Sequence, residues 1–64
     1  MLNLKNTKME LMFSEYKRIQ LSILNIDSFK QVAPTFKWIN LFEKRFKDVA
    51  LANSLKEMLK DIEL

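Results

Sequence analysis

Three carboxylates near the C-terminus are the first residues whose type and spacing could carry chemistry. Glu57 and Asp61 lie four positions apart, which places them on one side of a helix, and Glu63 follows. Carboxylate oxygens bind hard cations, but such a cation takes about six or more oxygens in a defined geometry, usually from a loop. Lys56 and Lys60 stand among these acids, as they do on a solvated helix face with ion pairs. We therefore expect no metal site in this segment.

Nucleophilic catalysis has little support in the composition. The chain has no histidine and no cysteine, so it lacks the usual general base near neutral pH and the thiolate that binds metals. A Ser–Lys dyad stays open, but no lysine stands at an informative spacing from the serines, which are Ser14, Ser22, Ser28 and Ser54. Glycine is absent, which excludes a glycine-rich phosphate loop. The sequence predicts a protein that is not an enzyme and uses no cofactor.

The segment FKWINLFEKRFK, residues 36–47, interleaves aromatic rings with cations. A helix with a period of 3.6 residues produces this interleaving when one side is buried and the other is solvated. The inner arc would hold Trp38, Ile39, Phe42, Phe46, Val49 and Ala50. The outer arc would hold Lys37, Asn40, Lys44 and Lys47. Phe36 and Leu41 lie off the inner arc, and Trp38 lies at its edge, so these three need another explanation.

Length and composition indicate one small domain, residues 1–64, built from helices. A chain of this size buries only about 60% of its unfolded surface, so its stability should be marginal. The hydrophobic content is 48%, the net charge is +3, and a single proline with no glycine leaves little tight-turn chemistry for a β-fold. The longest apolar run, Val49–Ala52, is far shorter than the roughly 20 residues of a membrane span. With no signal-peptide pattern at the N-terminus, we expect a cytoplasmic protein.

Helix starts are indicated by Ser or Thr followed three positions later by Glu or Gln, the capping-box pattern. Three such pairs occur, namely Thr7 with Glu10, Ser28 with Gln31, and Ser54 with Glu57. The first is followed by an apolar stripe of Met9, Met12, Phe13, Tyr16, Ile19, Ile23 and Ile26. This stripe predicts a helix over residues 8–25. It lasts under three heptads, which favours a bundle helix over a coiled coil.

Pro34 predicts a break in the middle of the chain. Proline disfavours a helical conformation at the preceding residue, Ala33, and it has no backbone N–H to donate. We therefore expect a short helix over residues 29–33, capped by Asp27 or Ser28, and a third helix over residues 35–50 that Thr35 caps.

Beyond Ala50 the apolar stripe changes direction. Its residues are Leu51, Ala52, Leu55, Met58, Leu59 and Ile62. On an unbroken helix this stripe would point about 150° away from Phe42 and Phe46. We favour a turn near Asn53-Ser54 and a last helix over residues 54–63. The alternative is one long helix, whose C-terminal part would need a second subunit to cover it.

The predicted fold is therefore all-α, with three to four helices at about 8–25, 29–33, 35–50 and 54–63, and we expect a homodimer. Large apolar side chains outside the stripes indicate a binding surface, because rings and arginine often anchor interfaces. We predict a protein-binding regulator or inhibitor whose cations steer an acidic partner. Its contact residues would be Phe36, Lys37, Trp38, Leu41, Lys44 and Arg45. Leu11 and Leu21, behind the first stripe, would also be covered by a second copy or a larger partner.

Two alternatives remain. Residues 30–47 carry five cations against Glu43, which suits a dimeric DNA- or RNA-binding regulator that uses Lys37, Lys44, Arg45 and Lys47. A helix-turn-helix interpretation has Pro34 inside its first helix and no glycine in its turn. An amphipathic membrane-surface helix with Trp38 at the interface is the other alternative. It would take into lipid the same rings that the core needs.

Overall fold

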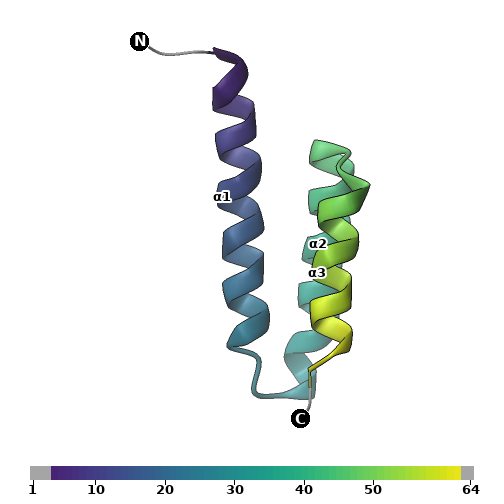
Figure 1. Cartoon of the computed structure of the whole chain (residues 1–64). Helices are drawn as coiled ribbons and strands as arrows, with labels where there is room; N and C mark the ends of the chain where they lie inside the picture. The colour runs from purple at the N-terminus through teal and green to yellow at the C-terminus, as the bar shows by residue number, and fades with distance from the viewer. Residues whose placement is uncertain (1–3, 63–64) are drawn as a thin grey trace.

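The computed structural model describes residues 4–62, with side chains from residue 7 onward. Helix α1 spans Leu4–Leu24, α2 spans Val32–Phe46 and α3 spans Val49–Lys60, with a short 3-10 helix, η1, at Phe29–Gln31. The described residues contain no strand, so the all-α prediction is confirmed. The three α-helices run up and down, each antiparallel to the one before it (Figure 1). Glu63, the third carboxylate considered above, lies outside the described residues.

The core is formed by all three α-helices. Its buried apolar residues are Ile19, Ile23, Ile39, Phe42, Ala52, Leu55 and Leu59. The ring of Phe42 lies at the centre, 6.4 Å from the ring of Tyr16 on α1 and 5.1 Å from that of Phe46. Tyr16 also reaches α3, where its hydroxyl lies 3.2 Å from the hydroxyl of Ser54. The inward stripes read from the sequence therefore meet in one core.

Helix α1 departs from its prediction at the N-terminal end. It begins at Leu4, so Thr7 lies inside the helix and does not cap it. Met9 and Phe13, expected on the buried stripe, are 53% and 45% exposed. In Figure 1 the N-terminal part of α1 projects beyond the ends of α2 and α3, so no neighbouring helix covers that end of the stripe. Phe13 is exposed for a different reason, because it lies off the side of α1 on which its neighbour Met12 packs against the core.

In the connection between α1 and α2, the side chains of Ser28 and Gln31 both accept backbone hydrogen bonds, as predicted, but Gln31 accepts its bond from a different residue than expected. The hydroxyl of Ser28 accepts a hydrogen bond of 3.3 Å from the N–H of Lys30, at the start of η1. The side-chain oxygen of Gln31 accepts one of 2.9 Å from the N–H of Asp27, whereas in a capping box it would accept from the N–H of Ser28. The short helix predicted over residues 29–33 is thus a 3-10 turn that ends at Gln31 and leads directly into α2.

The predicted bend at Pro34 is wrong. Helix α2 begins at Val32 and includes both Ala33 and Pro34. In the first turn of a helix the backbone N–H groups have no intrahelical partner, so proline gives up no hydrogen bond there. Thr35 does not cap the helix either. It is buried, and its hydroxyl donates a hydrogen bond of 2.8 Å to the carbonyl of Gln31 in the preceding turn.

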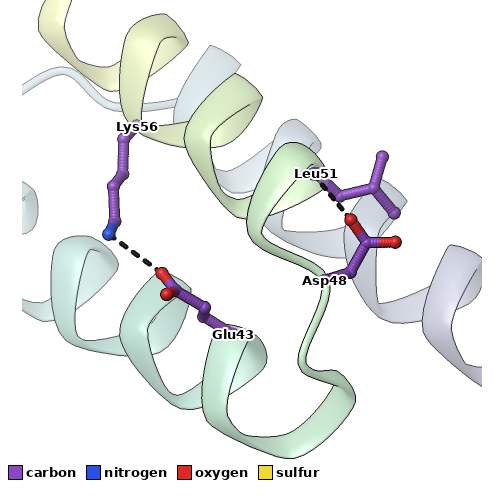
Figure 2. A network of polar contacts seen from close by, with 4 residues as sticks. All are labelled: Glu43, Asp48, Leu51 and Lys56. Carbon is purple, nitrogen blue, oxygen red and sulfur yellow. Dashed lines mark hydrogen bonds and ion pairs between the residues drawn. The ribbon is translucent and has the colours of Figure 1, made fainter.

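The turn between the last two helices lies at Lys47-Asp48, before the predicted Asn53-Ser54. Lys47 adopts the left-handed conformation, with φ 56°, and its N–H donates a hydrogen bond of 2.7 Å to the carbonyl of Glu43. A carboxylate oxygen of Asp48 then accepts one of 3.0 Å from the N–H of Leu51, which caps α3 (Figure 2). The predicted ends at residue 50 and at residue 54 are both corrected, and a single long helix is excluded.

This earlier turn changes which residues need a partner. The stripe that begins at Leu51 turns back onto the core of its own chain, where Ala52, Leu55 and Leu59 are buried. A second subunit is therefore not required to cover it. Val49 becomes 54% exposed instead, and Ala50 is exposed too, although both were expected on the inner arc.

Candidate functional site

The six predicted contact residues do not form one surface, because α2 carries them on different sides. Phe36 and Trp38 are two positions apart, which separates their directions by about 200° on a helix. Phe36 lies on the α3 side, with its ring 5.8 Å from the ammonium of Lys56. Trp38 lies on the α1 side and donates a hydrogen bond of 2.7 Å from its indole Nε1 to Glu15. It is partly buried against the core, so its ring and its indole N–H both have partners within the domain.

The other four contact residues share what we call the α2 outer face, which consists of Lys37, Leu41, Lys44 and Arg45. All four are exposed, and Leu41 is exposed over 64% of its surface. Their spacing of three and four residues places them along one side of the helix over about two turns. The guanidinium of Arg45 lies 5.1 Å from the ring of Phe46. The structure therefore brings together an exposed leucine and three cations.

The charge on the α2 outer face has one sign. Glu43 is the only carboxylate of residues 30–47, and it lies toward α3, where it accepts a hydrogen bond of 3.0 Å from Lys56 (Figure 2). It therefore does not offset the cations on the outer face. Lys44 and Arg45 also lie in the last turn of α2, where positive charge is favourable beside the free carbonyls.

A second surface, which we call the α2–α3 groove, lies along the seam between these two helices. Its main part is an open cleft of about 570 Å³ lined by Val32, Phe36, Asn53, Lys56, Glu57, Leu59 and Lys60. A smaller hollow of about 290 Å³ continues it and is lined by Phe29, Val32, Leu59, Lys60 and Ile62. Phe29 is 80% exposed and Phe36 is 44% exposed, so each places a large part of its ring at the surface.

Phe29 is a residue that sequence reasoning passed over, since it was expected only as the start of a short helix. The signal that could have found it is the spacing of Phe29, Val32 and Phe36, which are three and four positions apart. Because η1 leads directly into α2, this spacing holds the three apolar side chains along one wall of the groove.

Helix α1 carries most of the other exposed large apolar residues, including Leu24, which is 69% exposed. Leu11 and Leu21, predicted to lie behind the stripe, are 54% and 59% exposed. Met9 and Phe13 line a shallow depression along α1 together with Glu10, Ser14 and Lys17. Leu21 lies one turn beyond Lys17 on the same side of α1 as this depression, whereas Leu11 lies on a different side.

Within residues 4–62 no group of three or more acidic side chains is placed to hold a metal ion. No helix in that range combines the length and the apolar character needed to traverse a bilayer. Comparison of the chain with models of protein families, with curated proteins and with solved structures finds no match in any of the three.

Proposed function

We propose that the protein is a small non-enzymatic regulator or inhibitor that works as a homodimer and binds an acidic partner protein. The observation that supports this function is the α2 outer face, where the exposed Leu41 lies among Lys37, Lys44 and Arg45 on a surface without a carboxylate. An isolated exposed leucine would need no explanation. A leucine placed within a group of cations has the arrangement of an apolar anchor with a polar rim.

The two kinds of side chain would make different contributions to binding. Burying the exposed part of Leu41 would stabilise a complex by about 1–2 kcal/mol, the usual range for apolar area of this size. The cations would act mainly on the association rate and on the orientation of an acidic partner. Trp38 drops out of the contact set in this proposal, because it packs within the domain and is bonded to Glu15.

A binding experiment with matched leucine variants tests the proposal. Partners are captured from lysate of the producing cells and identified, and their affinity for the purified chain is then measured by calorimetry. We expect Leu41→Ala to weaken binding about tenfold, as loss of a buried leucine contact does. Leu21→Ala, which removes an equally exposed leucine on α1, should leave binding unchanged. Equal affinities of the wild type and Leu41→Ala for every captured partner would contradict the proposal.

Nucleic acid is the second candidate partner, because the cations of the α2 outer face, together with Lys47 at the end of α2, could contact phosphates. Lys37, Lys44, Arg45 and Lys47 are all exposed, which phosphate contacts require. The probe is a random-sequence DNA duplex and its RNA counterpart, titrated at several salt concentrations. Each phosphate neutralised should add about 0.9 to the slope of log affinity against log salt. A complex anchored by Leu41 should weaken far less with salt, and Leu41→Ala should not affect a phosphate-driven complex.

A further inference from the structure

The α2–α3 groove places two aromatic rings at the surface of the domain, outside its core. Phe29 is 80% exposed and does not belong to the hydrophobic core cluster, while Phe36 stands at the edge of the cleft, 44% exposed. Between them the groove floor is apolar, formed by Val32 on α2 and the nearly buried Leu59 on α3. Rings that flank an apolar floor form a surface that excludes water efficiently when it is covered.

The charges around this groove indicate what could cover it. Lys56 and Lys60 on α3 are separated by Glu57, and Glu43 on α2 pairs with Lys56. The groove edge therefore carries both signs. A two-fold axis brings each surface against an identical copy of itself, so only a surface with both signs can pair its own charges across such an axis. The α2 outer face fails this condition, because its three cations would meet three cations.

We propose that the α2–α3 groove is the interface through which two copies of this chain form a two-fold dimer. The proposal rests on the homodimer named in the proposed function and assigns its contact surface. Phe29 and Phe36 of each copy pack over the Val32 and Leu59 floor of the other, while Glu57 faces a lysine across the axis. The two α2 outer faces then remain free on the outside of the dimer for an acidic partner.

The size of the groove sets the expected strength of this dimer. Helix α3 has 12 residues, so the groove wall is about 18 Å long at 1.5 Å per residue. A standard stable interface buries about 800 Å² on each partner. A face as long as α3 and as wide as two helices has a smaller area than that. We therefore expect a dissociation constant in the micromolar range.

Sedimentation equilibrium over about 5–500 μM protein, which spans that range, tests the dimer directly. The wild type should pass from monomer to dimer. Phe29→Ser should raise the dissociation constant at least tenfold, and its fold should survive because an 80% exposed ring contributes little to the monomer. Leu21→Ser is the matched control, with an exposed leucine lost from α1 and dimerisation unchanged. A wild type that stays monomeric, or a Phe29→Ser variant that dimerises normally, overturns the proposal.

Cross-linking gives a second measurement that does not depend on removing a ring. The natural chain has no cysteine, so a single introduced thiol reports on one position. Asn53→Cys lies in the groove and Leu21→Cys on α1, and both positions are exposed. A short bismaleimide should join two copies through position 53 and not through position 21. The opposite result places the dimer contact on α1 and rejects the groove.

Loss of partner binding in Leu41→Ala is measured separately. A failure of the groove proposal and a failure of the proposal for the α2 outer face are therefore distinguishable.

Discussion

The indole Nε1 of Trp38 donates a hydrogen bond of 2.7 Å to the carboxylate of Glu15, and this contact joins α2 to α1. A hydrogen bond to a charged group is stronger than one between neutral groups, at about 1.5–3 kcal/mol. It holds the ring of Trp38 at the seam between the helices, where the ring packs against the core. The only tryptophan of the chain is thus a structural residue in this arrangement, although its sequence context favours a binding role.

Glu15→Ala should lower the free energy of unfolding by about 1–2 kcal/mol, because it removes the acceptor for the partly buried indole N–H. Urea denaturation followed by the fluorescence of the single tryptophan measures this change. Glu10→Ala removes an exposed carboxylate from the same helix and serves as the control, with a change within about 0.5 kcal/mol. Equal stabilities of the two variants would show that the Trp38–Glu15 contact contributes nothing.

Leu41 and Phe42 are sequence neighbours with opposite environments, since Leu41 is 64% exposed and Phe42 is 1% exposed. Phe42→Ala should cost about 3–5 kcal/mol through lost burial and a cavity, which approaches the whole stability of a small domain. We expect this variant to lose most of its helical circular dichroism at 37 °C. Leu41→Ala should melt within a few degrees of the wild type. A folded, stable Phe42→Ala protein would contradict the core described above.

Asp48→Ala should destabilise the domain by about 1 kcal/mol, because the carboxylate caps the N-terminus of α3 through Leu51. Asparagine is an equally good cap, so Asp48→Asn should recover most of the loss. Thermal melts of the three proteins, read by circular dichroism, compare them. If Asp48→Asn were as unstable as Asp48→Ala, the capping bond would not be the cause.

Lys47→Gly should raise the stability by up to about 1 kcal/mol. Lys47 has a φ of 56°, a left-handed conformation that glycine adopts without the steric cost of a Cβ atom. The same substitution at Lys37, inside α2, should lower the stability by about 1 kcal/mol, because glycine weakens a helix interior. Denaturant midpoints give both values, and changes of the same sign at the two positions would argue against the left-handed turn.

Much of the core was predictable from the apolar spacing. Ile19 and Ile23 on α1, and Leu55 and Leu59 on α3, were expected on inward stripes and are buried. Spacing of this kind depends only on the pitch of a helix and on which side chains avoid water, so it is present in the residues themselves. The same reasoning found the exposed cations of α2, because lysines at three- and four-residue spacing mark a solvated side.

The ends of the helices were less predictable, because several residues offer the same local signal. Ser54 followed by Glu57 has the pattern of a cap, but Asp48 provides the actual cap six residues earlier. Pro34 can stop a helix or open one, and the choice depends on whether its N–H would have had a partner. Packing of α3 against α2 and α1 selects the turn at Lys47-Asp48, since only that turn directs the stripe from Leu51 onward into the core.

The sequence alone determined that this chain is helical and which residues form most of its buried stripes, because both follow from spacing within a single element. Only the tertiary structure decided which exposed side chains share a surface. It separated Phe36 from Trp38, paired Glu43 with Lys56, and placed Phe29 beside Leu59 and Ile62. Such relationships depend on where one helix crosses another, and no single helix carries that information.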